Sequence, residues 1–249
     1  MKIALCFYGY FGKKNIEHHK QQLYGHILDD YNEMWSINHF KKFIIEGNDI
    51  DIFFHCWNEE EYIKKLLLKE YNPKDYLFET QDNVCSKDKS INKRFYSESK
   101  STELMLKYSK DNTIKYDFVM HTLFDQLFFT KINFNKLDNS FIYNSNWNRV
   151  QPNIILDNYY YNKLEGLYDQ WYICNMENIN KITNYENITK MYEKYDHRSY
   201  GSHKQRLYLI RHHGLEDKLK FIFYVGKDHV KCNQIFCPWY SHCLKWCIN

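Results

Sequence analysis

Four short apolar runs, separated by segments with helical periodicity, constrain the fold of this chain more than any other feature. The apolar runs are 3–7, 51–57, 76–79 and 116–123. The segments with helical spacing of apolar residues between them are 17–46, 59–69 and 95–109. Short apolar runs of this kind predict buried strands. Strands that alternate with helices predict an α/β fold with a mainly parallel central sheet flanked by helices.

The second half of the chain has a more mixed pattern. Short strand-like pieces are expected at 141–143, 149–156, 168–174 and 221–225. Helices are expected at 177–195 and 202–213. We find no linker rich in Gly, Ser or Pro and no internal repeat, so we expect a single domain over 1–249, with a nucleotide-binding half at 1–130.

Charge and hydropathy exclude several classes of protein. The 34 basic and 31 acidic side chains leave a net charge of +3, which is too small to indicate a nucleic-acid partner. No apolar stretch approaches the ~18 residues of a membrane-spanning helix. We find no leader of the basic-then-apolar type, so we expect no transmembrane segment and a cytoplasmic location, which for a viral protein is the host cytoplasm.

The cysteines and aromatic residues leave alternatives open. In a cytoplasmic setting the eight cysteines are expected to be reduced. The last four, Cys232, Cys237, Cys243 and Cys247, fit a zinc site only loosely, and buried free thiols are the alternative. Aromatic residues make up 18% of the chain. They fill a core, or they line a cleft for a base or a sugar.

The carboxyl ends of the expected strands are the first place to look for a binding site, because ligands of open α/β sheets bind there. These ends are Tyr8–Gly9, His55–Trp57, Glu79 and Phe124–Asp125. The loop after the first strand contains glycines that permit close backbone approach, and a pair of lysines. A plain glycine turn is the alternative. The loop matches neither a Walker loop nor a dinucleotide-binding fingerprint.

Two aspartates follow or precede expected strands. At a strand end, Asp125 suits a divalent cation that neutralises a diphosphate, and a turn or helix-cap aspartate is the alternative. Asp169 suits a general base or a ligand of sugar hydroxyls, and an exposed residue at the start of a strand is the alternative.

Five segments together resemble a family of small GT-A-type glycosyltransferases found in giant viruses and in bacterial capsule or lipopolysaccharide gene clusters. The segments are KIALCFYGYFGKK, DIDIFFHCW, RFYSESKSTELMLKY, YDFVMHTLFDQLFF and LYDQWYICNMENI. They are similar to the family's opening strand and loop, its D-x-F-x-H-x-W strand, its S-x-x-Y-S-x-x-K helix, its YD-x-V-x-R-x-R-x-D strand and its later D-x-x-x-I-G segment. Their shared order covers most of the chain.

The resemblance implies a GT-A-like fold and a hexosyltransferase that moves a sugar from a nucleotide-diphosphate donor to a hydroxyl of a glycan acceptor. The acceptor-binding half would be 131–249, which ends in an aromatic and Cys-rich tail. The residues implied at the nucleotide donor are Tyr8, Gly9, Tyr10, Asp51, His55, Trp57, Ser97 and Lys100. Asp125 is implied as the ligand of Mn²⁺ or Mg²⁺, and Asp169 as the base that faces the acceptor.

The chain departs from the family at positions that matter for catalysis. The two arginines before the aspartate are His121 and Leu123 here, and a single carboxylate, Asp125, remains. Fewer fixed cations weaken the stabilisation of a diphosphate leaving group. A metal ion, or Lys100 with Arg149, would have to compensate. The alternatives are a non-catalytic module that binds a glycan or a nucleotide, and a binder of single-stranded nucleic acid. The oligomeric state is open.

Overall fold

The computed structural model describes residues 1–12, 34–82, 93–146, 167–188, 190, 202–224 and 228–231. The strands are β1 (Lys2–Gly9), β2 (Asp49–Cys56), β3 (Asp75–Phe78), β4 (Phe118–Leu123), β5 (Gln126–Phe128), β6 (Ile142–Asn146), β7 (Trp171–Cys174), β8 (Leu219–Tyr224) and β9 (His229–Lys231). The α-helices are α2 (Met34–Phe40), α3 (Glu61–Tyr71), α5 (Lys93–Asp111), α6 (Met176–Thr183) and α8 (Ser202–His212). Three short turns are η1 (Lys41–Ile45), η2 (Phe134–Lys136) and η4 (Glu216–Lys218).

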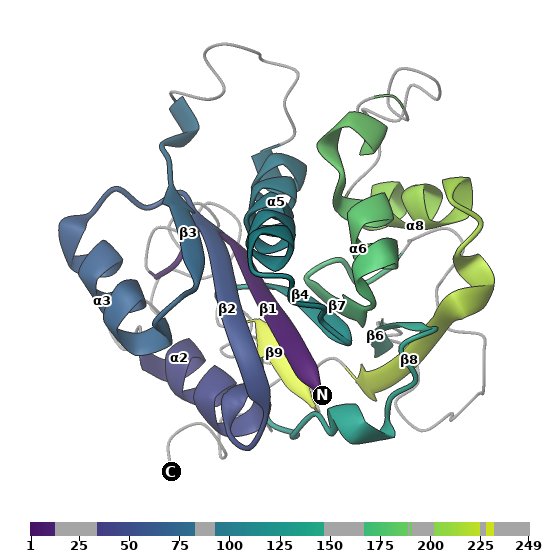
Figure 1. Ribbon diagram of the computed structural model, residues 1–249, viewed down its shortest axis with the longest axis horizontal. Coiled ribbons are helices and arrows are strands. Elements are labelled where there is room, and N and C mark those ends of the chain that lie inside the picture. Colours follow the sequence, from purple (N-terminus) through teal and green to yellow (C-terminus); the bar gives the residue numbers. More distant parts are fainter. Residues whose placement is uncertain are drawn as a thin grey trace, which may run out of the picture.

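A seven-stranded sheet in the order β3-β2-β1-β4-β7-β6-β8 forms the centre of the molecule (Figure 1). Strands β3, β2, β1 and β4 are parallel neighbours, and β6 and β8 are also parallel. Of the strands in this described sheet, β7 alone runs in the opposite direction. The fold class expected from the sequence, α/β with a mainly parallel central sheet flanked by helices, is confirmed.

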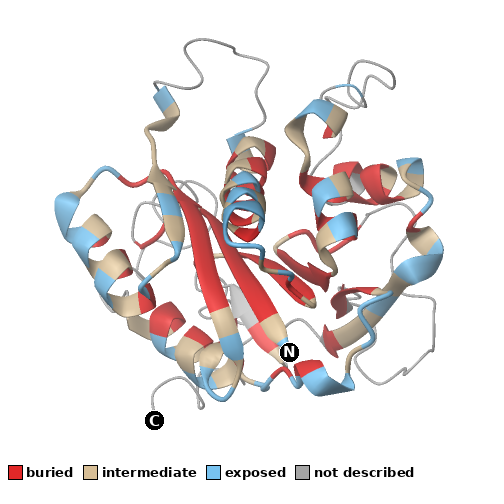
Figure 2. Cartoon of the chain, in the orientation of Figure 1, coloured by how far each residue is buried: buried red, intermediate tan, exposed pale blue. Residues whose placement is uncertain are grey.

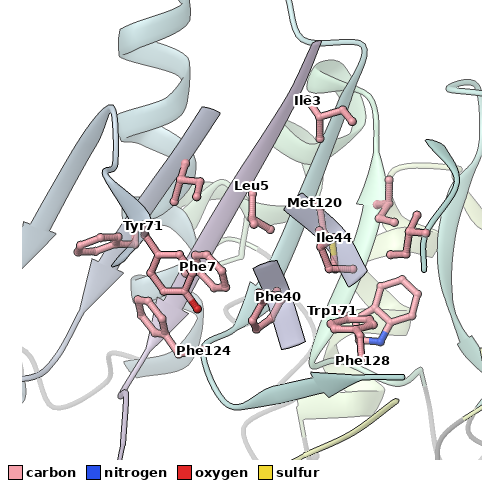
Figure 3. Close-up of a cluster of buried hydrophobic side chains, with 14 of the residues drawn as sticks. Ile3, Leu5, Phe7, Phe40, Ile44, Tyr71, Met120, Phe124, Phe128 and Trp171 are labelled. Carbon is pink, nitrogen blue, oxygen red and sulfur yellow. The ribbon is translucent and has the colours of Figure 1, made fainter. Parts of the chain in front are cut away.

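Successive side chains of β1 point to opposite faces of the sheet. Both faces therefore present apolar residues, and helices cover each of them. Ile3, Leu5 and Phe7 belong to one core, together with residues of α2, η1 and α3. Figure 3 shows part of this core, with Phe7 beside Phe40, Tyr71 and Phe124. Ala4 and Cys6 belong to the other core, with residues of α5, α6 and α8.

The central strands are buried on both faces, which explains their nearly continuous apolar sequence. β1 is buried from Ile3 to Tyr8, and β2 from Asp51 to Cys56 (Figure 2). Among the described residues, no helix is long and apolar enough to span a membrane.

Several boundaries differ from the expectations. The helix expected at 177–195 is interrupted, because α6 ends at Thr183 and Asn184 has an extended ψ of 118°. Residues 185–188 and 190 are helical again, and 189 and 191–195 lie outside the described residues. Strands β5 and β9, which pair with each other, were not expected, because three residues are too few for a periodic pattern. Of the helix expected at 17–46, residues 17–33 lie outside the described residues, as do the strand expected at 149–156 and the four cysteines of the tail.

Candidate functional site

The order of the strands reverses between β1 and β4. From β1 the chain moves outward through β2 to β3, and it then returns through α5 to β4 on the other side of β1. Ligands of open α/β sheets bind at such a reversal, beyond the carboxyl ends of the strands. The ends of β1 and β4 lie side by side here, with Tyr8 paired to Leu123. Gly9 follows Tyr8, and Asp125 comes shortly after Leu123.

Gly9 occupies a position that requires glycine. Its φ is +99°, in the left-handed region that other residues rarely adopt. A Cβ atom at this position would lie 3.2 Å from Leu123 Cδ2. The chain therefore turns at Gly9, and this turn packs closely against Leu123 at the end of β4.

Polar contacts from β2 and α5 hold the Gly9 turn. The Gly9 amide donates to Ser97 Oγ at 2.9 Å, and the Gly9 carbonyl accepts from the Trp57 amide at 3.1 Å. The Ser97 Oγ is 2.7 Å from His55 Nδ1, and His55 Nε2 is 3.0 Å from Glu79 Oε2. The structure thus brings Gly9, His55, Trp57 and Ser97 together at the carboxyl ends of neighbouring strands.

Burial keeps His55 neutral. Its side chain has no exposed area, and this burial lowers the pKa of His55, whereas the hydrogen bond to Glu79 acts in the opposite direction. A neutral imidazole has one donor and one acceptor nitrogen, which suits contacts with a hydroxyl on one side and a carboxylate on the other.

Aromatic rings and a lysine lie next to this turn. The Trp57 ring packs edge-on against His55 at 4.4 Å and stacks on Tyr96 at 5.6 Å between ring centroids. Lys100 Nζ lies 5.4 Å from the centroid of the Tyr96 ring, and 2.7 Å from Glu103 Oε2. The Lys100 side chain is 31% exposed, so its charge faces solvent at the edge of the cluster.

The Tyr8 side chain points into a different, buried network. Its hydroxyl donates to the Asp169 carbonyl at 3.1 Å and accepts from Arg94 Nη2 at 2.9 Å. Arg94 Nη1 also binds Asp169 Oδ2 at 2.7 Å. Burial raises the pKa of the Tyr8 phenol well above its usual value. Tyr8 and Asp169, which the resemblance implied at the donor and at the acceptor, therefore meet in one buried network.

A second arginine extends this network. Arg206 of α8 pairs with Glu98 of α5, and both side chains are buried. The guanidinium group of Arg206 also lies 4.9 Å from the Phe95 ring and 4.8 Å from the Tyr172 ring. Arg94 Nε reaches the same Glu98 at 3.5 Å. Two arginines and two carboxylates, those of Glu98 and Asp169, balance each other in charge.

His121 occupies one of the positions where the family has arginine, and it lies beside this network. Its Nε2 atom is 2.9 Å from Thr102 Oγ1. Burial lowers the pKa of His121 well below its usual value, and the positive charges of Arg206 and Arg94 add to this effect. Arg94 of α5 and Arg206 of α8 thus place positive charge near His121. Arg149 lies outside the described residues.

Asp125 lies at the end of β4 and is 1% exposed. Among the residues that the structure describes, no three His, Cys, Asp or Glu side chains come together in a way that could hold a metal ion. Mg²⁺ commonly binds proteins through one or two carboxylates together with substrate phosphates and water. One carboxylate therefore fits a divalent cation here only when a bound diphosphate supplies further oxygen ligands.

Asp51 is not part of the cluster, although the resemblance implied it. It lies near the amino end of β2, paired with Ala4 in the register, whereas His55 is paired with Tyr8. Its Oδ2 atom accepts a hydrogen bond from the Tyr116 hydroxyl at 2.8 Å and lies 3.2 Å from Lys2 Nζ. The D-x-F-x-H-x-W motif spans the strand, so its first and last residues are found at different ends.

Tyr10 follows Gly9 directly in the chain, and its side chain is half-buried. It is therefore next to the turn, as the resemblance implied. The residue after it, Phe11, is held by Asn58, whose Oδ1 accepts from the Phe11 amide at 2.8 Å and whose Nδ2 donates to the Phe11 carbonyl at 3.1 Å. The backbone beyond Gly9 is thus fixed on a second side.

Sequence reasoning missed several residues that build the site. They are Asn58, Arg94, Tyr96 and Arg206. Glu79 was named as a strand end but not given a role, and Asn58 comes two residues after the end of β2. No local pattern indicates the pair of Arg94 and Asp169, because the two residues are 75 positions apart.

Comparisons with known proteins give a fold-level similarity. No protein-family model and no curated protein sequence matches the chain. The structure is similar to the apo form of the glycosyltransferase GlyE of Streptococcus pneumoniae TIGR4, with 12% identity and a TM-score of 0.42 over 86% of this chain and 44% of that chain. A second GlyE structure has 9% identity and a TM-score of 0.42 over 89% of this chain and 45% of that chain.

The chain thus spans less than half the length of the solved structures it matches. Similarity at this level concerns the arrangement of helices and strands, and a TM-score of 0.42 is too low to carry an argument about activity.

Proposed function

We propose that the chain is a GT-A-type glycosyltransferase that transfers a sugar from a nucleotide-diphosphate donor to a hydroxyl of a glycan acceptor. The observation that carries this proposal is the position of Gly9 and Asp125 at the reversal of strand order between β1 and β4. A glycine turn and a carboxylate at this place suit a phosphate-containing ligand bound beyond the strand ends. Residues 131–249 would then supply the acceptor side.

The donor would lie along the carboxyl ends of β1 and β2. Lys100 offers a partly exposed ammonium group for a phosphate, beside the ring of Tyr96. The hydroxyl of Ser97 is occupied by Gly9 and His55, so we propose that Ser97 affects the donor through the turn. Gly9 has no side chain of its own, which allows closer approach of the diphosphate to the backbone.

We propose that Asp125 binds Mn²⁺ or Mg²⁺ together with the donor diphosphate. When bound, such an ion neutralises the charge that develops on the leaving diphosphate. Asp125 is the carboxylate nearest along the chain to the end of β4, which supports its role in holding the cation. Arg94 and Arg206 do not replace the ion, because Asp169 and Glu98 balance their charges.

A second candidate function is a non-catalytic module that binds a nucleotide or a glycan. The buried ion pair of Asp169 with Arg94 favours it, because the base implied by the resemblance is not exposed to an acceptor. Such a module would bind the donor at the same site as the proposed enzyme but would not transfer the sugar.

Thermal unfolding with a panel of UDP-, GDP-, dTDP- and CMP-sugars, each with EDTA, Mg²⁺ or Mn²⁺, tests the proposal. A ligand at ~100 times its Kd stabilises a protein by about 2.7 kcal/mol, which raises the Tm of a chain of this size by roughly 5–10 °C. We expect one nucleotide family to give a metal-dependent shift. Asp125→Asn should lose the metal dependence.

The control is Asp117→Asn, at the opposite end of β4, where the carboxylate accepts a hydrogen bond from the Lys2 amide at 2.8 Å. This variant should keep the full shift with donor and metal. No shift of the wild-type protein with any donor would refute the proposal. Donor binding without release of the nucleotide diphosphate, in the presence of glycan acceptors, would favour the non-catalytic module.

A further inference from the structure

We propose that Glu79, His55 and Ser97 form a hydrogen-bonded relay that positions the Gly9 turn for the nucleotide donor, with Glu79 as a positioning residue at its outer end. This inference rests on the proposed function for the identity of the ligand. The relay crosses from the end of β3 through β2 and α5 to the end of β1, so it joins the strand ends that surround the candidate site.

The direction of each hydrogen bond follows from the two ends of the relay. The Gly9 amide can only donate, so Ser97 Oγ accepts from it at 2.9 Å. The hydrogen bond with His55 lowers the pKa of Glu79, and an ionised carboxylate can only accept, so His55 Nε2 carries the proton and donates to Glu79 Oε2 at 3.0 Å. Nδ1 of neutral His55 is then the acceptor nitrogen, and the Ser97 hydroxyl donates to it at 2.7 Å. A single tautomer of neutral His55 satisfies the whole chain of contacts.

The relay leads from the surface through two buried side chains to the partly buried amide of Gly9. His55 and Ser97 have no exposed area, whereas the Glu79 side chain is 28% exposed. The Tyr96 hydroxyl also donates to Glu79 Oε2, at 3.1 Å. Because Glu79 is the end that solvent reaches, it can be changed without opening the core. Its removal leaves the buried His55 N–H without its carboxylate acceptor.

A serine, a histidine and a carboxylate in one line also describe a hydrolase triad, but the geometry excludes a nucleophile here. Ser97 Oγ is buried in the first turns of α5 and already accepts from the Gly9 amide. A nucleophile needs access to a substrate carbonyl. The group that the relay fixes is therefore Gly9, and its conformation at φ +99° is what the contacts maintain.

Hydrogen exchange of the Gly9 amide tests the relay directly. Labelling with ¹⁵N-glycine gives eight backbone signals, one for each glycine, and sequential assignment identifies Gly9. We expect Glu79→Ala and Ser97→Ala to speed exchange at Gly9 on the order of 10-fold, since each variant removes a buried hydrogen-bond partner. Glu79→Gln, which keeps an acceptor oxygen for His55, should restore slow exchange.

The matched control is Glu70→Ala on the opposite face of the sheet. Glu70 is also partly buried, with its side chain 15% exposed and Oε2 2.6 Å from Lys41 Nζ. It should lower Tm about as much as Glu79→Ala and leave exchange at Gly9 unchanged. Unchanged exchange at Gly9 in Glu79→Ala would overturn the relay.

Donor affinity provides the second measurement, with UDP-glucose, GDP-mannose and dTDP-glucose as probes in titration calorimetry. We expect Glu79→Ala to weaken the binding of whichever probe the wild-type protein binds by about 10-fold, with rescue by Glu79→Gln and no change in Glu70→Ala. Equal affinity in Glu79→Ala and wild type, despite faster exchange at Gly9, would overturn the positioning role. If the wild-type protein binds no donor of the panel, the proposed function fails, and the donor role of the relay fails with it.

Discussion

Two roles compete for Asp169, and its surroundings separate them. A general base has to reach the acceptor hydroxyl and take its proton. The Asp169 carboxylate is instead buried and bound to Arg94 Nη1 at 2.7 Å, and Arg94 also contacts the Tyr8 hydroxyl. A buried carboxylate that neutralises an arginine keeps its negative charge and orients its partner. The geometry therefore favours a role for Asp169 in holding Arg94 and the end of β1.

Asp169→Asn and Arg94→Gln distinguish the two roles when they are made singly and together. If Asp169 holds Arg94, the Asn variant leaves the guanidinium group only its longer contact with Glu98 at 3.5 Å and should lose about 1–3 kcal/mol of stability. The double variant should then lose little more than either single one, because a neutral pair remains. Unfolding in urea measures this cycle.

A base role gives a different pattern in the same variants. Asp169→Asn would reduce turnover by about 10²–10⁴-fold and leave stability nearly unchanged. Additive losses of stability in the double variant would contradict the pairing role. Stability therefore tests the pairing of Asp169 with Arg94, and turnover tests Asp169 as a general base.

At the scale of elements, α5 links the candidate site to the core. The first half of this helix buries polar side chains, among them Ser97, Glu98, Ser101 and Thr102, against the ends of β1, β2 and β4. The second half buries Met105 in the apolar core. Buried polar groups need partners, and the partners of these side chains come from β1, β2, β4, β7 and α8. Because these partners lie at fixed places, α5 can satisfy its buried polar side chains at one position on the sheet.

The pair of Glu98 and Arg206 joins α5 to α8 and is the most buried ion pair of the described network. Removing one partner of a buried pair costs about 3–5 kcal/mol, because the other charge stays buried. Glu98→Gln should therefore lower Tm by roughly 6–20 °C. Glu98→Leu combined with Arg206→Met should recover most of that loss, because apolar residues of similar volume can replace a buried pair.

An exposed pair provides the control for this prediction. Lys64 and Glu61 of α3 lie 2.8 Å apart, and the Glu61 side chain is 73% exposed. Glu61→Gln should leave the Tm nearly unchanged, as is usual for exposed pairs. Calorimetric unfolding of the three variants and the wild-type protein gives the comparison. A small loss in Glu98→Gln would mean that Arg206 finds another partner or that the helix shifts.

At the scale of the whole molecule, the sequence was sufficient for the fold class and insufficient for the site. Strands β1, β2 and β4 have continuous apolar sequences because both of their faces are buried, and such runs are recognisable. The buried face of α5 is not recognisable, because serines and a glutamate look like a solvated surface. Asp51 was misplaced because the resemblance assigned the whole D-x-F-x-H-x-W motif to the donor, although the motif runs along the strand and only its carboxyl end lies at the site.

The site also depends on contacts between distant parts of the chain. Arg94 meets Asp169 and Glu98 meets Arg206 only after α5 and α8 pack on the same face of the sheet. Periodicity identifies each helix but not the register in which it docks. Local sequence patterns therefore predict the helices and strands. They do not predict the polar clusters between them, because these clusters form only when the elements pack together.

Burial of histidine in this fold should make the whole protein sensitive to acid. His229 lies in an enclosed position between β5 and the central sheet, where Nε2 accepts from Trp171 Nε1 at 3.2 Å and contacts the Ser145 hydroxyl. Burial lowers the pKa of His229 to about 3 from a usual 6.5. Between these values the unfolded chain binds a proton that the folded chain does not.

The stability that neutral His229 contributes is therefore complete above pH 6.5 and is lost as the pH falls toward 3. The loss is about 1.4 kcal/mol per pH unit, or about 2–3 kcal/mol between pH 6.5 and 4.5. His229→Gln keeps an acceptor oxygen for Trp171 but does not titrate, so its loss of stability over this range should be smaller by about 2 kcal/mol.

Trp171→Phe is the control, because it lowers stability at pH 7 and keeps the histidine. Urea unfolding at pH 7.0 and 4.5 measures both differences, and equal acid sensitivity of wild type and His229→Gln would show that His229 is protonated in the folded protein.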